Sequence, residues 1–318
     1  MNPNSENTSD QNQPEEMGSG SSVFLTPPDS IQVIEPPRGL VAINVREIWA
    51  YRELFAFLVW RDVKVKYKQT LLGAAWAVLV PFFQMIVFTV IFGGLARIPT
   101  NGLPNPVYYM ANLVIWTYFA TSLSMSSQSM VGNERLLTKV YFPRLIVPLA
   151  PCLASLVDFL IAFAILIGIL FCYGIVPSPA IFLLPVMVLM AFGTAAGAGL
   201  FLSALNVKYR DVRYVIPFLI QTWMYCSVII PFSKFGEHFG RWRYLYGLNP
   251  MGTVVEGFRW CLMHHRMTVE SRVGDPVVQM APEAPWMLFL MSVPVVLVML
   301  CIGIAYFKRM ESQFADIV

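Results

Sequence analysis

Charged groups within apolar segments are the residues of this chain whose types and positions could do chemistry. Asp158 stands in the middle of an apolar run, where an ionised carboxylate costs about 2.5–3.5 kcal/mol on membrane-insertion scales. It must therefore face a partner, water or a pore, either as a structural hydrogen-bonding group or as a proton relay. Proton-coupled carriers usually use chains of acids and histidines, and Asp158 has no second acid at a similar position, so the structural role is favoured.

Few other side chains could take part in chemistry. Glu256 and Arg259 are three residues apart in a short amphipathic run, which lets an acid and a base meet on one helix face. His264 and His265 are adjacent and would point about 100° apart on a helix, so no metal site is predicted. The sequence has no G-x-x-x-x-G-K-[ST] phosphate loop and no H-E-x-x-H or G-x-S-x-G motif. We predict a chain that is not an enzyme, holds no cofactor or metal, and cannot hydrolyse ATP by itself.

The composition indicates a membrane protein. Of 318 residues, 57% are hydrophobic and only 13% are charged, whereas soluble chains approach about 25% charged. The net charge of +3 is small and the basic residues are grouped by loop, so nucleic acid is not an expected partner. The five cysteines have no C-x-x-C spacing and predict neither disulfides nor a metal site.

Six segments supply the roughly 20 mostly apolar residues needed to cross about 30 Å of hydrocarbon. They are Leu71 to Leu95, Val107 to Val131, Leu145 to Tyr173, Ala180 to Leu205, Val215 to Phe232 and Trp286 to Phe307. The predicted fold class is thus an all-α integral membrane protein with six transmembrane helices. Within the fourth segment, Gly193 and Gly197 have the spacing of a close helix contact, which is favoured over a functional role.

Basic residues in the connections give the orientation, because lysine and arginine are retained on the cytoplasmic side. Before the first span lie Arg46, Arg52, Arg61, Lys64, Lys66 and Lys68, and between spans two and three lie Arg135, Lys139 and Arg144. Between spans four and five lie Lys208, Arg210 and Arg213, and after the last span come Lys308 and Arg309. We predict a multi-pass membrane protein with both termini cytoplasmic. The first apolar run begins only near Leu71, so no cleavable signal peptide is expected.

The remaining segments complete the predicted organisation. Residues 1–37 are polar and predict a disordered cytoplasmic tail, and residues 311–318 form the cytoplasmic C-terminus. In residues 38–68, Ile48, Trp49, Phe55, Leu58 and Val59 can share one face of an amphipathic interface helix. Residues 69–310 form the transmembrane domain. Its external region, residues 233–285, contains a run at 249–263 that is too short to span and predicts short re-entrant helices.

Four blocks resemble one family, in the same order along residues 40–310. They are RDVKVKYKQTLLGAAWAVLVP at 61–81, NERLLTKVYFPRLIVPLA at 133–150, NVKYRDVRYVIPFLIQTWMY at 206–225 and LNPMGTVVEGFRW at 248–260. Together they resemble the permease subunits of ABC-2-type exporters of polysaccharides and polyol phosphates, which move O-antigens, capsules and teichoic acids. The resemblance implies a homodimer in the bacterial inner membrane, with a separate ATP-binding subunit that holds ATP and Mg²⁺. It also implies an undecaprenyl-diphosphate-linked glycan as substrate.

The resemblance also implies roles for particular residues. Residues 132–144 correspond to the loop that couples to the ATPase, and a helix over 133–140 would expose Leu136, Leu137 and Val140. The predicted coupling residues are Asn133, Glu134, Arg135, Leu136, Leu137, Lys139, Tyr141 and Phe142. Similar exporters line their conduit with aromatic rings, which implies Trp76, Phe83, Trp223 and Tyr225 here, although aromatic belts at the membrane interface are an equal alternative. Lipid head groups would meet Trp49, Trp60, Arg61, Lys64 and Tyr67, and the external gate would include Asn249, Glu256 and Arg259.

Two other functions remain open on the sequence. An ABC-2 permease for drugs or other lipids would share the fold, and only the specific blocks argue against it. An ion-coupled secondary transporter is permitted by Asp158 but disfavoured by the lack of inverted repeats and of further charges within the spans.

Overall fold

The computed structural model describes residues 45–68, 75–137, 142–229, 232, 240–267, 269–271, 278–280 and 285–311. The predicted tail at 1–37, the coupling residues Lys139 and Tyr141, and the last residues 312–318 lie outside the described residues. All described elements belong to one unit, residues 39–318.

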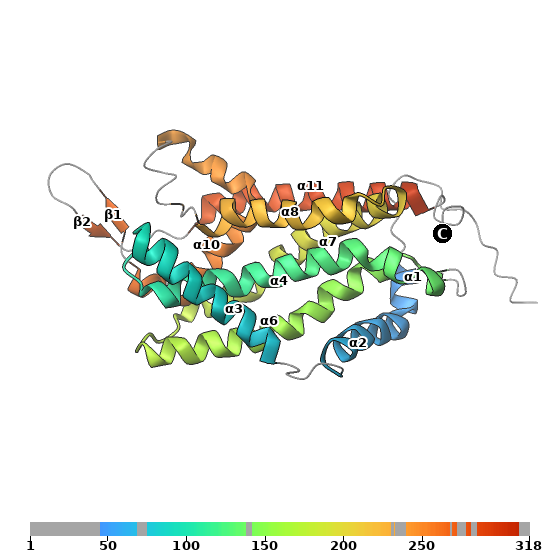
Figure 1. Cartoon of the computed structure of the whole chain (residues 1–318). Helices are drawn as coiled ribbons and strands as arrows, with labels where there is room; N and C mark the ends of the chain where they lie inside the picture. Colours follow the sequence, from blue (N-terminus) through green and yellow to red (C-terminus); the bar gives the residue numbers. More distant parts are fainter. Residues whose placement is uncertain are drawn as a thin grey trace, which may run out of the picture. The chain divides into compact units, whose positions relative to one another are not determined.

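Helices make up nearly all of the described chain (Figure 1). The α-helices are α1 (Val45–Ala50), α2 (Arg52–Lys68), α3 (Ala75–Phe88), α4 (Asn105–Gly132), α5 (Glu134–Leu137), α6 (Ile146–Cys172), α7 (Leu184–Lys208), α8 (Val212–Met224), α10 (Pro250–Met263) and α11 (Trp286–Glu311). The π- and 3₁₀-helical segments are η1 (Thr89–Leu95), η2 (Pro179–Leu183), η3 (Tyr225–Ile229), η4 (Gly240–Leu248) and η5 (His264–Arg266). The strands β1 (Val269–Ser271) and β2 (Val278–Met280) form an antiparallel pair.

Five helical segments are long and apolar enough to cross a membrane, by length and composition: Val78–Leu95, Ile146–Cys172, Pro179–Lys208, Val212–Ile229 and Trp286–Glu311. They correspond to five of the six predicted spans. The remaining predicted span, Val107 to Val131, corresponds to α4, whose 28 residues would cover about 42 Å at 1.5 Å per residue. Its asparagine, serine and glutamine residues lower its mean hydropathy.

Helix α4 can hold polar residues because it lies among the other helices. It contacts α3, α6, α7, α8 and α10, and most of its side chains are buried, including Asn112, Ser122 and Ser126. Figure 1 shows α4 running between α6 and α8. A helix surrounded by protein does not need the apolar surface that lipid contact demands.

Three details of the fold differ from the predicted all-α pattern of uninterrupted spans. The first and fifth predicted spans end in the π-helical segments η1 and η3. The hairpin of β1 and β2 was not expected. All of these elements are seven residues or shorter, so their hydrophobic periodicity is too brief to distinguish them from an α-helix or a loop.

The predicted interface helix is divided at Tyr51 into α1 and α2, and it packs against α6. Leu58 of α2 is buried with Ile146 and Ala150 of α6. Tyr51 and Leu54 join this contact, whereas Trp49, predicted on the same face as Leu58, is 69% exposed. Ile48, Phe55 and Val59 of the predicted face also pack in this cluster. The predicted apolar face is therefore the one that lies along the first half of α6, and only Trp49 lies outside the contact.

The small residues of α7 allow a close contact with α11, as predicted. A Cβ atom built on Gly197 would lie 2.8 Å from the backbone nitrogen of Leu300, and one on Gly193 would lie 2.9 Å from Val296 Cγ1. Gly303 of α11 faces the backbone of Gly197 in return. The two backbones therefore touch where these glycines meet.

The ends of several helices gather in one apolar cluster, which we call the basal cluster. It joins the end of α4, the start of α6 and the ends of α7 and α11, through Met130, Phe142, Leu145, Val147, Leu200, Ala204, Val207, Phe307 and Met310. Arg144 extends this contact by donating a hydrogen bond of 2.6 Å to the carbonyl oxygen of Glu311.

The α7–α11 contact gives a first prediction. Gly197→Ala should lower the stability of the chain by about 1–3 kcal/mol, because the added methyl group meets backbone atoms that cannot move independently. Thermal unfolding of the purified chain in detergent measures the effect. Gly168→Ala is the matched control, since a Cβ atom at Gly168 meets nothing within 4 Å. Equal melting temperatures for the two variants would contradict the close contact.

Candidate functional site

The partners of Asp158 come from the end of α2. Lys66 forms an ion pair with one carboxylate oxygen of Asp158, and the hydroxyl of Tyr67 donates a hydrogen bond to the other. Burial and the acceptor Asp158 raise the pKa of Tyr67, so this phenol stays protonated and keeps donating. These two residues provide the partners that the sequence position of Asp158 demands.

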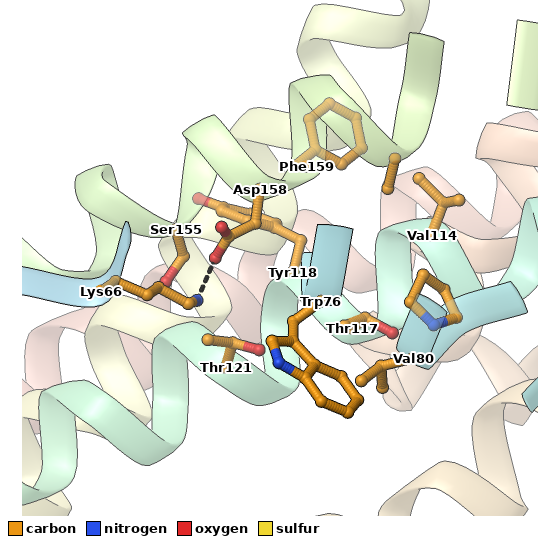
Figure 2. Close-up of a pocket in the computed structure, with 12 residues that line it drawn as sticks. Lys66, Trp76, Val80, Val114, Thr117, Tyr118, Thr121, Ser155, Asp158 and Phe159 are labelled. Carbon is orange, nitrogen blue, oxygen red and sulfur yellow. Dashed lines mark hydrogen bonds and ion pairs between the residues drawn. The ribbon is translucent and has the colours of Figure 1, made fainter. Parts of the chain in front are cut away.

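A cavity of about 190 Å³ lies beside this ion pair. Figure 2 shows Lys66 and Asp158 on one side, with Trp76, Thr117 and Thr121 placed around the space. Helices α2, α3, α4 and α6 all contribute to its walls, with the residues Lys66, Trp76, Val80, Pro81, Val114, Thr117, Tyr118, Thr121, Ser155, Asp158, Phe159 and Ala162. The walls are therefore largely apolar with a few polar groups, the usual composition of a ligand site.

The predicted head-group residues lie along α2 and differ in their surroundings. Trp60 is 64% exposed, and Lys64 is exposed as well. Arg61 pairs with the neighbouring Asp62 at 2.8 Å, and Tyr67 turns toward Asp158. The structure thus leaves Trp60 and Lys64 on the surface of α2 and draws Tyr67 into the contact with α6.

The predicted conduit aromatics lie on three helical segments, α3, α8 and η3, that all contact α4. Trp76 and Phe83 of α3 are 51% and 59% exposed, and Tyr225 at the start of η3 is 46% exposed. Trp223 of α8 is half-buried, with its ring edge against Phe119 of α4. Trp76 also lines the cavity. The four rings therefore do not form one cluster within a single chain.

Asn249 connects α8 to α10. Its side-chain oxygen caps α10 by accepting a hydrogen bond from the backbone nitrogen of Gly252 at 3.2 Å. The same oxygen accepts the indole N–H of Trp223 at 2.8 Å, and the side-chain nitrogen donates to Ser227 Oγ at 2.9 Å. A predicted gate residue and a predicted conduit residue are thus in direct contact.

Arg259 is buried at the centre of a polar group between α10 and α4. It is 1% exposed, pairs with Glu256 and donates a hydrogen bond of 3.2 Å to Asn112 Oδ1. Its guanidinium lies 4.4 Å from the ring centroid of Tyr108, within the range of a cation–π contact. The pair of Glu256 and Arg259 follows from their spacing. Asn112 and Tyr108 were not predicted, although an asparagine within an apolar run is a possible sign of such a contact.

The described part of the predicted coupling segment contains one short helix. Helix α5 covers Glu134–Leu137, after Asn133, whose side chain donates to the carbonyl oxygen of Ser129 at 2.8 Å. Leu136 and Leu137 were expected on an exposed face, but both are partly buried against the basal cluster, which contains the predicted residue Phe142. Their apolar side chains gain more from that packing than from water contact. Glu134 and Arg135 form the exposed surface of the segment.

The apolar helices and their buried polar contacts define a multi-pass α-helical membrane protein. Residues 53–263 match the ABC-2 type transporter family, which is about two thirds of the chain. The chain therefore belongs to this family of transporter membrane proteins. The match includes α2, the cavity, the coupling segment and α10.

Curated relatives are similar to the chain over most of its length. The O-antigen export system permease protein RfbA of Myxococcus xanthus is 27% identical over 274 residues, which cover 86% of this chain and 98% of that protein. Two Klebsiella pneumoniae proteins of the same description are each 24% identical over 267 residues, covering 83% of this chain and 95% of theirs.

The buried pair gives a second prediction. Arg259→Leu should destabilise the chain by about 3–5 kcal/mol, because the mostly buried Glu256 is then left without its partner. The double variant Glu256→Gln with Arg259→Leu leaves no buried charge and should recover much of that loss. Melting temperatures in detergent compare the variants. A double variant that is no more stable than the single one would show that the pair is not the source of the effect.

Proposed function

We propose that the chain is the permease subunit of an ATP-driven exporter that moves a lipid-linked polysaccharide across the inner membrane. The observation that carries the proposal is that a chain of the ABC-2 family matches three O-antigen export permeases over nearly their full lengths. Its sequence lacks a phosphate loop, so the energy must come from another subunit.

In this proposal α4 is the second of six spans, and both termini are cytoplasmic. The basal cluster supports this topology, because it unites the ends of α4, α7 and α11 with the start of α6, all of which the loop charges assign to the cytoplasm. At the other end, Ser178 of the loop between α6 and α7 donates its backbone N–H to the carbonyl oxygen of Leu262 in α10, at 2.9 Å. That contact agrees with an external position for the end of α10.

Helix α10 then forms the second arm of a re-entrant element. Its first end is held by Trp223 and Ser227, within the fifth span, while its last turn reaches the external loop at Ser178. The 3₁₀ segment η4 leads into it and packs on α11, where Ser292 Oγ donates to the carbonyl oxygen of Gly247 at 2.6 Å. Asn249, Glu256 and Arg259 would fix this arm as part of an external gate.

A homodimer would complete the conduit. The exposed aromatic rings Trp76, Phe83 and Tyr225 lie on α3 and η3, and both of these segments contact α4. Two copies facing each other would enclose these surfaces, and an undecaprenyl-diphosphate-linked glycan would pass between them. Trp60 and Lys64 on α2, together with Arg61, would meet its anionic head group.

A separate ATP-binding subunit, holding ATP and Mg²⁺, would dock on residues 132–144. Its closure on nucleotide would move α4 and α6 through this segment, because Asn133 is bonded to the last turn of α4 and Phe142 packs in the basal cluster. The exposed Glu134 and Arg135 would form the polar part of the contact.

Deletion of the gene tests the substrate and the mechanism together. The proposed function predicts that lipid-linked glycan accumulates on the cytoplasmic side and that the wild-type gene restores export. Export should require the ATP-binding subunit and be inhibited by vanadate. No accumulation of glycan would favour the alternative of another lipid or a drug as substrate, and export that depends on an ion gradient alone would favour a secondary transporter.

Charge reversal tests the coupling segment. Glu134→Lys should weaken binding of the ATP-binding subunit about tenfold, equal to about 1.4 kcal/mol, without unfolding the chain. Co-purification and size-exclusion profiles measure both effects. Glu53→Lys is the matched control, because Glu53 is an exposed acid in α2 outside the segment. Normal binding by Glu134→Lys would contradict its role in docking, whereas Leu136 is unsuitable for this test because it packs against the basal cluster.

A further inference from the structure

The cavity between α2, α3, α4 and α6 has polar groups that no role described above uses. It lies beside Asp158, twelve residues from the first residue of α6, which is roughly 18 Å along the helix. Figure 2 shows that its polar groups come from different helices and surround the same space. The identity of these groups limits what can occupy it.

The carboxylate of Asp158 is paired with a cation and can accept more hydrogen bonds. Lys66 and Tyr67 each bond to one of its two oxygens. A carboxylate has about four lone-pair sites, so about two remain for a donor in the cavity. The side chain of Asp158 keeps 16% of its surface exposed. One edge of Asp158 is thus an acceptor for hydroxyl groups.

Two threonines of α4 offer free hydroxyl groups to the same cavity. Thr117 and Thr121 are one turn apart on α4, line the cavity and are partly exposed. Within the described part of the chain, neither hydroxyl forms a hydrogen bond, whereas Ser155 on α6 bonds to the carbonyl oxygen of Pro151 at 2.9 Å. Their hydroxyls are therefore available to bond to whatever fills the cavity.

The remaining wall is apolar and includes an open aromatic ring. Trp76 is 51% exposed and has no ring contact with another described aromatic residue, and Val80, Val114 and Ala162 line the same space. An acyl chain would leave the remaining acceptor sites of Asp158 and both threonine hydroxyls without a bond from the cavity. A phosphate would meet the negative charge of Asp158, with Lys66 already paired to it. A neutral group with one apolar face and several hydroxyls satisfies all of the walls.

We propose that the cavity is a saccharide subsite that takes one pyranose ring, with Trp76 against the apolar face of the ring and Thr117, Thr121 and Asp158 bonded to its hydroxyl groups. The volume of about 190 Å³ is smaller than that of the pockets of roughly 300–1,000 Å³ that hold drug-sized ligands, which limits the occupant to about one ring. The inference rests on the proposed function, because a polysaccharide exporter brings sugars to these helices.

Binding of simple glycosides tests the subsite. The chain, in complex with its ATP-binding subunit in lipid nanodiscs, would be titrated with methyl glucoside, methyl galactoside and methyl mannoside, using saturation-transfer NMR. At least one should bind, with the strongest transfer to the ring C–H protons that face Trp76. The double variant Thr117→Val with Thr121→Val keeps the shape of both side chains and should bind at least tenfold more weakly.

A matched control and two opposing results make the test decisive. Ser124→Ala removes a partly exposed hydroxyl from α4, three residues beyond Thr121 and outside the cavity, so it should bind like the wild type. Failure of all three glycosides to bind would overturn the subsite, and so would equal binding by the double threonine variant. The co-purified amount of each variant shows that it is folded.

An export measurement separates this inference from the proposed function. In cells, the double threonine variant should slow export of the glycan about tenfold at equal abundance, and Ser124→Ala should not. If gene deletion causes glycan accumulation while the double variant binds and exports normally, the subsite is wrong and the function stands. If deletion causes no accumulation, the function fails and the subsite fails with it.

Discussion

The carboxylate of Asp158, in the middle of α6, is the constraint on which the arrangement of α2, α3, α4 and α6 depends. The hydrocarbon core of a membrane offers no water to Asp158, so protein groups must bond to it. Lys66 and Tyr67 do so from the last turn of α2, which fixes that helix along the first half of α6. The cavity follows from this arrangement, because α2, α3, α4 and α6 meet beside the ion pair.

The same requirement shapes the opposite end of the chain. Arg259 is buried in α10 and is bonded to Glu256 and to Asn112 of α4. Asn249 bonds to Trp223 and Ser227 while it caps the same helix. These contacts hold the short helix α10 against the longer helices. The length and apolar surface of α10 alone would not fix it there.

The surroundings of α4 differ in packing and exposure, and this difference suits a transporter. On one side, α7 packs on α11 through Gly193, Gly197 and Gly303, with their backbones in contact. On the other side, α3 and α8 leave large aromatic side chains exposed, including Trp76, Phe83 and Phe218. The closely packed helices α7 and α11 form a support for α4. The exposed rings are available to contact a second copy of the chain, lipid or substrate.

The sequence by itself determined the features that depend on composition and short spacing. Long apolar runs located five membrane-crossing segments, the glycines of residues 193–199 indicated a helix contact, and the spacing of Glu256 and Arg259 predicted their pair. Four motif blocks indicated the ABC-2 family, which the match over residues 53–263 confirmed.

Tertiary structure alone decided which distant residues meet. Lys66 is 92 residues from Asp158 and Asn112 is 147 residues from Arg259, and no periodicity within one segment can specify such pairs. It also decided that Leu136 and Leu137 pack inward, because an exposed leucine and one buried by a neighbouring helix look the same in a short amphipathic run. The charge of Asp158 within an apolar segment predicted that it needs a partner. Only the packing of α2 on α6 showed that Lys66 and Tyr67 are its partners.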